Sequence, residues 1–329
     1  MAGEDPWYRG ETIEDGLVED EFDRRDALLR GDFSRWRAGG AHAFVEPWTG
    51  MPERFFLFRL EGTWYVGCKT LSDHVVYEGG SGLLCSRVNW SHVVGPLTGT
   101  RCSDADVRVG FEPLGVAERR RVFAAIGPET EILHPFPMHD AASGQEAGGP
   151  SEGWFLTEER AELLASGERH LRAYTHELFS RLFAAGSGRV TAYDPACSTG
   201  RFLADFAAIA PDRIRTVGQD LSAQMTGYAA AHLDEVHHGD ALHPCLGERQ
   251  ADVVFSRFLN SEVVTTAQAR AILPGLVRTV RKGGLLVLFG HTPVLLDSHD
   301  LTAQGLRVRQ TTGRHDGSVF QYYVCDRPD

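Results

Sequence analysis

The sequence predicts an α/β protein in which a doubly wound, mostly parallel β-sheet forms the C-terminal half and a smaller α+β region precedes it. Residues 155–329 alternate between strand-like and helix-like segments, which is typical of a parallel sheet with helices on both faces. Residues 140–153 are small and polar without apolar periodicity, so they are the best candidate for a linker. We therefore predict two domains, 1–150 and 151–329.

The N-terminal region combines helical and strand signals. Residues 13–38 are charged with scattered apolar positions and predict one or two exposed helices, which Gly39-Gly40 would end. Strand-like runs follow at 55–60, 63–66, 74–77 and 107–111. The first two flank Glu61-Gly62 and predict a tight hairpin. No motif in this region indicates a particular chemistry.

The C-terminal region begins with a predicted helix and continues as a strand–helix alternation. Apolar side chains at helical spacing predict one helix over 158–185, with Thr157 as its N-cap. The predicted strands are 189–193, 215–219, 235–238, 251–257, 285–290, 306–310 and 319–325. The predicted helices between them are 200–210, 223–232 and 266–281. The last two strands are close enough in sequence to form an antiparallel pair at the sheet edge.

Composition limits the classes of function. The formal net charge is −12 and no long basic run is present, so nucleic-acid binding is disfavoured, because it depends on Lys and Arg meeting phosphates. No apolar stretch approaches the roughly 18 residues of a membrane span, and the acidic N-terminus lacks the apolar core of a signal peptide. We expect a reduced, cytoplasmic protein with no membrane or nucleic-acid partner. Its oligomeric state is left open.

A metal site is not expected. None of the six cysteines forms a CxxC pair, which argues against structural zinc. Histidines gather at His237-His238 with His243, and at His291 with His299. Adjacent residues of a strand face opposite sides, however, so His237 and His238 cannot easily share one ion.

Acidic residues follow three successive predicted strands. Asp194 follows the first, Asp220 ends the second and Asp240 follows the third. In a doubly wound sheet, ligands bind at these carboxyl ends of the strands. Asp220 could accept both hydroxyls of a ribose, and Asp240 could accept the exocyclic amine of adenine. Taken singly, Asp220 could instead be a surface helix cap and Asp240 a turn residue; together, the three acids favour a nucleoside site.

The turn after the first strand, Asp194-Pro195-Ala196-Cys197-Ser198-Thr199-Gly200, is built from small residues. Ala196, Ser198 and Gly200 occupy the tight positions where the backbone must approach a ligand. With a single glycine this is not the dinucleotide fingerprint, and the alternative is an ordinary strand-to-helix turn. Cys197 sits where a helix N-terminus would lower its pKa, yet we expect it to pack against the ligand rather than to act as a nucleophile.

Polar residues after the fourth and fifth parallel strands are candidates for the acceptor side. Arg257 could pair with a carboxylate of either the nucleoside ligand or the acceptor. Asn260 and Glu262 could orient or deprotonate a nucleophile, and His291 is a candidate base near neutral pH. The alternatives are a solvent-facing helix start and a hydrogen-bonded structural histidine.

Together these motifs resemble class I S-adenosylmethionine (SAM)-dependent methyltransferases over residues 155–329. The resemblance rests on residues 194–200 as motif I, 218–222 as motif II and 239–241 as the acidic adenine loop, with 273–289 similar to the family's helix and fifth strand. It departs from the family at Ala196 and Ser198, where glycines are usual. It implies a Rossmann-like fold and SAM as co-substrate. The cofactor-binding residues it implies are Asp194, Ala196, Cys197, Ser198, Gly200, Asp220, Leu221, Met225, Gly239, Asp240, Ala241 and Arg257.

Residues 194–200, 218–222 and 257–264 are further similar to 3-amino-3-carboxypropyl transferases of the isonocardicin synthase type. That resemblance implies transfer of the 3-amino-3-carboxypropyl group of SAM to a phenolic oxygen of a nocardicin-like β-lactam antibiotic precursor, with release of methylthioadenosine. His291, Glu262 and Asn260 are then the candidate catalytic residues, and region 1–150 would bind or cover the small-molecule acceptor.

The residues alone leave the transferred group open, because the choice depends on which carbon of the sulfonium lies in line with the nucleophile. A SAM-dependent methyltransferase acting on a small-molecule natural product is the alternative. A non-catalytic SAM-binding protein is a third possibility, and the titratable residues Arg257, Glu262 and His291 argue against it.

Overall fold

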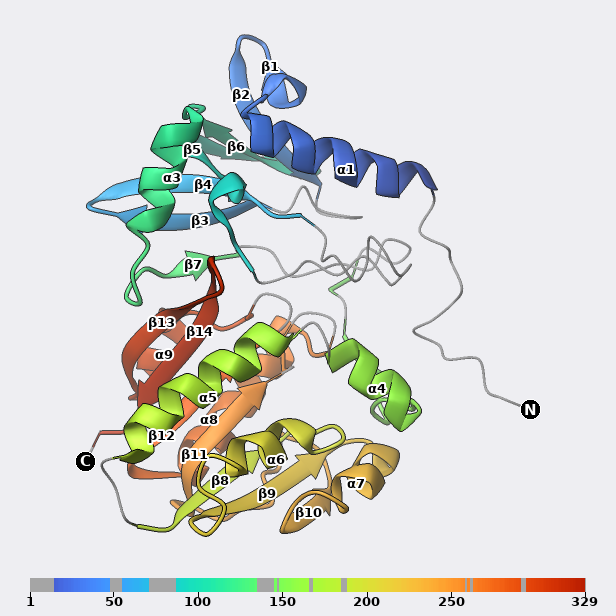
Figure 1. The fold of residues 1–329 in the computed structure, drawn as a ribbon. Helices are drawn as coiled ribbons and strands as arrows, with labels where there is room; N and C mark the ends of the chain where they lie inside the picture. The colour runs from blue at the N-terminus through green and yellow to red at the C-terminus, as the bar shows by residue number, and fades with distance from the viewer. Residues whose placement is uncertain are drawn as a thin grey trace. The chain divides into compact units, whose positions relative to one another are not determined.

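The computed structural model describes residues 15–47, 55–70, 87–134, 145–146, 148–165, 168–184, 188–257, 259–260, 263–290 and 294–328. The chain divides into two compact units, Met1–Ala147 with Gly317–Phe320, and Gly148–Asp316 with Gln321–Asp329. Each unit is organised around one seven-stranded sheet (Figure 1).

The sheet of the first unit is antiparallel in each pairing that the described residues make. Its order is β1-β2-β6-β5-β4-β3-β7. The strands are β1 (Arg37–Ala38), β2 (Ala41–Pro47), β3 (Phe55–Leu60), β4 (Thr63–Cys68), β5 (Val93–Cys102), β6 (Asp106–Phe111) and β7 (Ile132–Leu133). The predicted hairpin is confirmed: Glu61 and Gly62 both have positive φ, 48° and 86°, which suits a two-residue turn whose twist matches that of the strands.

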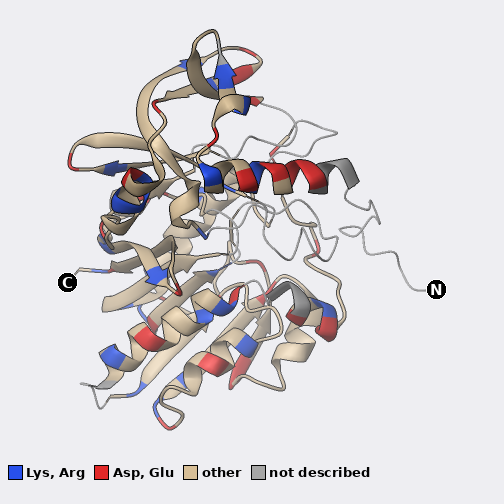
Figure 2. Cartoon of the chain, turned by 45° about the horizontal axis from the view of Figure 1, so that its top comes forward, with Lys and Arg blue, Asp and Glu red and all other residues tan. Residues whose placement is uncertain are grey.

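The helices of the first unit are α1 (Asp15–Arg30) and α3 (Val116–Ala124), with short 3-10 turns η1 (Ser34–Trp36) and η2 (Trp90–His92). Figure 2 shows acidic and basic residues interspersed along α1, where Arg24 pairs with Asp20 one turn away, a spacing that supports a helix. Helix is confirmed for 15–30 and wrong for 34–38, which form η1 and β1. The reason is tertiary packing: Trp36 is buried with its ring 5.4 Å from that of Phe44 in β2.

The prediction of a strand at 107–111 is also confirmed, as part of β6. The predicted strand at 74–77 lies outside the described residues. Strands β2 and β5 were not predicted.

The sheet of the second unit has the order β10-β9-β8-β11-β12-β14-β13. Its strands are β8 (Val190–Asp194), β9 (Ile214–Asp220), β10 (Glu235–His238), β11 (Ala251–Arg257), β12 (Val280–Phe289), β13 (Arg307–His315) and β14 (Ser318–Asp326). The first five strands in this order pair in parallel, and β14 runs antiparallel to β12. The predicted doubly wound sheet is therefore confirmed. Its strand order reverses between β8 and β11, where such folds bind their ligands.

Helices cover both faces of this sheet. Neighbouring residues of a strand face opposite sides, so apolar side chains on both faces need a helix to pack against. The helices are α4 (Glu158–Ala165), α5 (Arg169–Ala184), α6 (Arg201–Ala207), α7 (Ala223–Ala229), α8 (Thr266–Thr279) and α9 (Ser298–Ala303). On β11, Phe255 meets Phe179 of α5 and Phe206 of α6. Its neighbour Val254 belongs to the opposite core cluster, with Leu276 of α8.

The predicted helix over 158–185 is wrong in one respect, since α4 ends at Ala165 and α5 begins at Arg169. Ser166 and Gly167 lie between them in sequence and both have lower helix propensity than alanine. Thr157 caps α4 as predicted, accepting a hydrogen bond from the backbone N–H of Arg160 at 3.2 Å. Strand β12 starts earlier than predicted, at Val280, which is fully buried and pairs with Ala251.

Strands β13 and β14 are neighbours at the sheet edge, as predicted. They are joined by Asp316 and Gly317, whose φ angles are 47° and 68°. Asp-Gly is a favoured pair for such a two-residue turn.

Replacing two of the glycines by alanine should change stability in opposite directions. Gly200, at the start of α6, has φ of +78°, and a Cβ there would lie 3.0–3.1 Å from Leu233 and Ala229. Gly227 lies inside α7 with nothing within 4 Å of an added Cβ. We expect Gly200→Ala to lower the free energy of unfolding by about 1–3 kcal/mol, and Gly227→Ala to raise it by about 0.5–1 kcal/mol. Urea unfolding measures both, and equal effects would contradict the assigned backbone.

Candidate functional site: an acidic pocket at the strand ends

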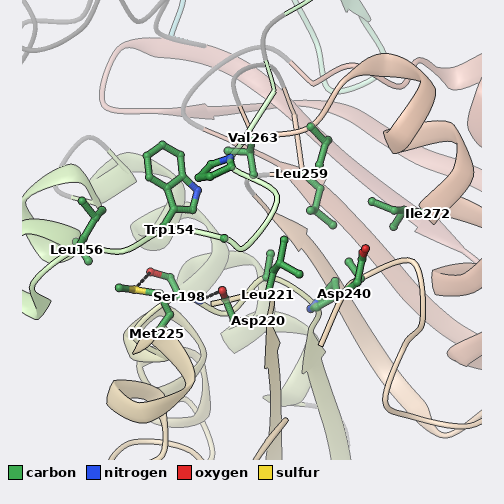
Figure 3. A pocket seen from close by; sticks show the side chains of 18 residues that line it. Trp154, Leu156, Ser198, Asp220, Leu221, Met225, Asp240, Leu259, Val263 and Ile272 are labelled. Carbon is green, nitrogen blue, oxygen red and sulfur yellow. Dashed lines mark hydrogen bonds between the residues drawn. The ribbon is translucent and has the colours of Figure 1, made fainter. Parts of the chain in front are cut away.

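A pocket lies in the second unit at the carboxyl ends of β8, β9, β10 and β11 (Figure 3). It is mostly apolar, and the charged residues among those that line it are both aspartates. The lining residues are Gly149, Pro150, Gly153, Trp154, Leu156, Ala161, Pro195, Ala196, Ser198, Asp220, Leu221, Met225, Asp240, Ala241, Leu259, Val263, Val264 and Ile272. The sheet topology therefore brings the loops that follow β8, β9, β10 and β11 to one place.

Asp220 is the buried acid of this pocket. One carboxylate oxygen accepts a hydrogen bond from the backbone N–H of Ser198 at 2.8 Å, and the other accepts from that of Ser222 at 2.9 Å. Burial nevertheless raises the pKa of Asp220 to about 6. Ser222, and not Asp220, caps α7 through its side chain. Asp220 is thus no surface cap but a carboxylate held at the pocket wall.

Asp240 is exposed and reaches the pocket from the loop after β10. Its carboxylate accepts a hydrogen bond from the backbone N–H of Leu242 at 2.8 Å. Gln219 fixes this loop from below, because its amide nitrogen donates to the carbonyl of Asp240 at 2.8 Å. The carbonyl oxygen of Gln219 accepts from the Tyr193 hydroxyl and from the Cys245 backbone N–H. A single buried glutamine therefore ties the acidic loop to the ends of β8 and β9.

The β8–α6 turn is compact for reasons that its small residues explain. Ser198 has φ of +52°, a left-handed conformation that glycine adopts more easily, and this aims its N–H at Asp220. Ser198 therefore stands where glycine would be less strained. A Cβ on Gly218 would lie 2.8 Å from the Cys197 sulfur, so the thiol packs under β9 and does not face the pocket.

The expected lowering of the Cys197 pKa is wrong. The thiol is buried, and burial raises its pKa well above the ordinary value, with Asp194 and Asp220 adding to the rise. Desolvation of the thiolate outweighs the helix N-terminus. Cys197 is a packing residue in this structure.

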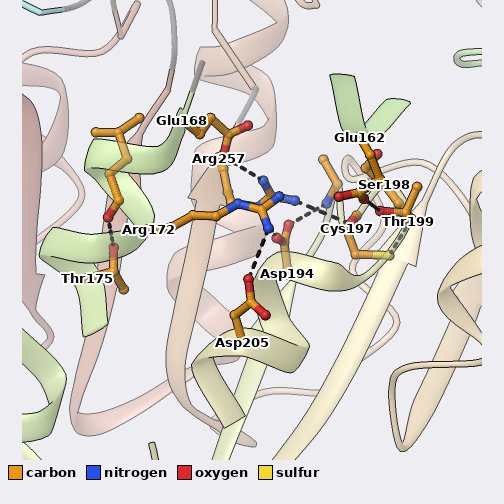
Figure 4. A network of polar contacts seen from close by, with 12 residues as sticks. Glu162, Glu168, Arg172, Thr175, Asp194, Cys197, Ser198, Thr199, Asp205 and Arg257 are labelled. Carbon is orange, nitrogen blue, oxygen red and sulfur yellow. Dashed lines mark hydrogen bonds and ion pairs between the residues drawn. The ribbon is translucent and has the colours of Figure 1, made fainter. Parts of the chain in front are cut away.

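Arg257 differs from expectation in its partners (Figure 4). We expected it to pair with a carboxylate of a ligand, but its guanidinium is buried against carboxylates of the chain itself. It donates to Asp194 at 2.6 Å, to Glu168 at 3.1 Å and to the carbonyl of Cys197 at 3.3 Å. Although burial acts against it, Asp194 and Glu168 raise the pKa of Arg257, which stays charged. Arg257 thus joins β11, β8 and the start of α5 beneath the pocket.

The segment before α4 forms the pocket wall that the sequence did not indicate. We predicted 140–153 as a linker, but residues from 148 onward belong to the second unit. The Gly149 N–H donates to the carbonyl of Val263 at 2.7 Å. Gly153 has φ of +78°, and a Cβ there would lie 2.6 Å from the backbone nitrogen of Ser222. The two glycines allow this segment to lie close against the site and place Trp154 at the pocket.

The predicted residues divide into three groups. Those that line the pocket are Ala196, Ser198, Asp220, Leu221, Met225, Asp240 and Ala241. Those that do not line it are Asp194, Cys197, Gly200, Gly239 and Arg257, of which Asp194 and Arg257 hold the turn from beneath. The third group is the catalytic set, of which Glu262 and His291 lie outside the described residues. Asn260 is buried beside Gly290. A Cβ added to Gly290 would lie 2.0 Å from the side-chain amide nitrogen of Asn260.

Two of the histidines considered for a metal have other partners. His237 lies 2.6 Å from a carboxylate oxygen of Glu235, and a ring nitrogen of His238 lies 3.0 Å from the carbonyl of Leu221. Within the described ranges, no cluster of three or more His, Cys, Asp or Glu side chains is arranged to hold a metal ion.

The described helices are too short or too polar to cross a membrane.

The raised pKa of Asp220 predicts a pH-dependent cost. The unfolded chain releases this proton near pH 3.8, whereas the folded protein keeps it to about pH 6. The stability present below pH 4 is therefore lost as pH rises through 6, by about 3 kcal/mol at 1.36 kcal/mol per pKa unit. We expect the unfolding free energy of Asp220→Asn, relative to the ligand-free wild type, to rise by about 2 kcal/mol between pH 4 and 7, because part of the change already lies below pH 4.

Denaturant unfolding across this pH range measures the difference. Asp212→Asn removes the same charge at an exposed position and serves as the control. A difference between Asp220→Asn and wild type that stays constant with pH would show that Asp220 titrates normally.

Comparison with known proteins agrees with this geometry. Residues 192–284 match a model described as a methyltransferase domain. Isonocardicin synthase of Nocardia uniformis subsp. tsuyamanensis is 36% identical over 287 residues, which cover 84% of this chain and 92% of that protein.

Solved structures align with part of the chain. SAM-bound CalS10, an amino pentose methyltransferase of Micromonospora echinaspora, is 18% identical over 53% of this chain and 98% of its own, with a TM-score of 0.41. A SAM-dependent methyltransferase from Aquifex aeolicus is 18% identical over 52% of this chain and 100% of its own, with a TM-score of 0.40. Membership of a family is shown by the 36% identity to isonocardicin synthase across most of both chains. The chain belongs to the isonocardicin synthase family within the class I SAM-dependent methyltransferase superfamily, and SAM is its co-substrate.

Proposed function

We propose that this protein transfers the 3-amino-3-carboxypropyl group of SAM to a phenolic oxygen of a nocardicin-like β-lactam precursor and releases methylthioadenosine. The observation that carries the proposal is the 36% identity to isonocardicin synthase across most of both chains. The motifs at 194–200, 218–222 and 257–264 support the same assignment, since all three resemble aminocarboxypropyl transferases of that type.

We assign the donor to the pocket at the strand ends. Asp220, half of whose hydrogen-bonding capacity is taken by Ser198 and Ser222, would accept the ribose hydroxyls with its remaining lone pairs. The adenine ring would lie between Leu221 and Leu259, with Asp240 near its amine. Apolar walls with a few placed polar groups are what nucleoside-sized ligands need.

In the proposed reaction the phenol oxygen forms a bond to the γ-carbon of the methionine part of SAM. The bond from that carbon to sulfur breaks, and its electron pair stays on sulfur, which leaves as the neutral thioether of methylthioadenosine. The phenol proton passes to a base, for which His291 and Glu262 stay candidates, and Asn260 would orient the acceptor. A phenol with a pKa of about 10 needs only modest assistance.

Methyl transfer to a small-molecule natural product is the second candidate. The match of residues 192–284 to a methyltransferase domain favours it. The pocket described above would serve either reaction, because both use the same sulfonium donor. Binding of the acceptor by residues 1–150 is part of both proposals.

The nucleoside product distinguishes the two reactions. We expect methylthioadenosine when the protein is incubated with SAM and a nocardicin-like phenol, identified by chromatography and mass spectrometry. S-adenosylhomocysteine as the main product would instead establish methyl transfer. An acceptor whose phenolic hydroxyl is replaced by hydrogen is the control and should give neither product.

The ribose assignment has its own test. We expect Asp220→Ala to weaken SAM binding by about 1–3 kcal/mol, because buried ribose hydroxyls would lose their acceptor. Isothermal titration calorimetry measures the affinity, and Asp212→Ala removes an exposed aspartate as the matched control. Unchanged affinity in Asp220→Ala would refute the placement of the ribose.

A further inference from the structure

We infer that Trp154 recognises the positive charge of the SAM sulfonium and so distinguishes the donor from its neutral thioether products. The inference rests on the nucleoside placement proposed above, but not on which group is transferred. Trp154 is not part of the motifs that define the family resemblance. It enters the site from the segment before α4, directly after the predicted linker at 140–153, and the sequence indicated no role for it.

The pocket has two ends, which Figure 3 separates clearly. Asp240, Leu259 and Ile272 lie toward one end, which is the proposed adenine side. Trp154 and Leu156 lie toward the other. Asp220 lies between the two ends, so a ribose held there directs its 5′ carbon, and the sulfur attached to it, toward the end that carries Trp154.

The ring of Trp154 is held from several sides. Trp154 packs against the cluster of Leu156, Ala161 and Met225, against which Tyr228 also packs. Its backbone follows Gly153, which lies against the turn of Leu221 and Ser222. The indole is therefore positioned by neighbouring elements of the same unit.

The charge of the pocket as a whole favours a cation. Among the described residues that line it, the charged ones are Asp220 and Asp240, and none is Lys, Arg or His. A tryptophan face attracts a cation more strongly than other aromatic faces do, and the attraction grows where water is excluded. The sulfonium of SAM carries this charge, whereas S-adenosylhomocysteine has the same adenosyl and amino-acid parts around a neutral sulfur.

The test compares the two ligands in matched variants. We expect Trp154→Leu to weaken SAM binding about tenfold and S-adenosylhomocysteine binding by less than about threefold. Trp154→Phe keeps an aromatic face and should retain most of the preference for SAM. Phe155→Leu changes the neighbouring aromatic residue, which is 78% exposed, and should alter neither affinity.

Each outcome of the calorimetry decides the inference. A larger loss for SAM than for S-adenosylhomocysteine supports charge recognition. Equal losses for both ligands overturn it and leave Trp154 as a packing residue, and no loss for either places the sulfur elsewhere. These results are independent of the product assay, since binding of both ligands is measured without an acceptor.

Discussion

The buried contacts of Arg257 hold together the parts from which the donor pocket is built. A guanidinium with 2% of its side chain exposed would be strongly destabilising alone, so the fold must supply carboxylates to it. Asp194 arrives from the end of β8 and Glu168 from the start of α5, while the carbonyl of Cys197 takes a further N–H. Removing the guanidinium would leave two buried carboxylates without their counter-charge, so Arg257 holds these elements to each other.

The geometry of the β8–α6 turn follows from that anchor. With Asp194 and the carbonyl of Cys197 held by Arg257, the chain must reverse within a few residues, and Ser198 and Gly200 do so with positive φ angles. The reversal directs the Ser198 N–H to Asp220, which links the turn after β8 to the end of β9. Gln219 then links the end of β9 to the loop after β10 through the carbonyl of Asp240. The pocket is thus supported by a set of buried and partly buried polar contacts.

The sequence predicted the parts of this arrangement that depend on local pattern. Alternating segments indicated the parallel sheet, and acids at strand ends indicated Asp220 and Asp240, because sheet topology alone brings such positions together. It did not predict that Arg257 would be paired with Glu168, since the two are 89 residues apart and no local pattern connects them. Trp154 was missed because the residues directly before it have the small, polar composition of a linker, and the last of them, Gly153, is what allows close packing on Ser222.

Only some residues of the site can determine which group of SAM is transferred. In the proposed placement, Asp220 and the adenine walls would hold the part of SAM that methylation and aminocarboxypropyl transfer share, so they would not distinguish the two reactions. The sulfonium offers its methyl and its γ-carbon in different directions, and the one in line with the acceptor oxygen reacts. With the ribose fixed, that direction is set by rotation about the bond to sulfur. The determinants therefore lie around the sulfur, which the proposed placement puts at the Trp154 end of the pocket, and on the elements that position the acceptor.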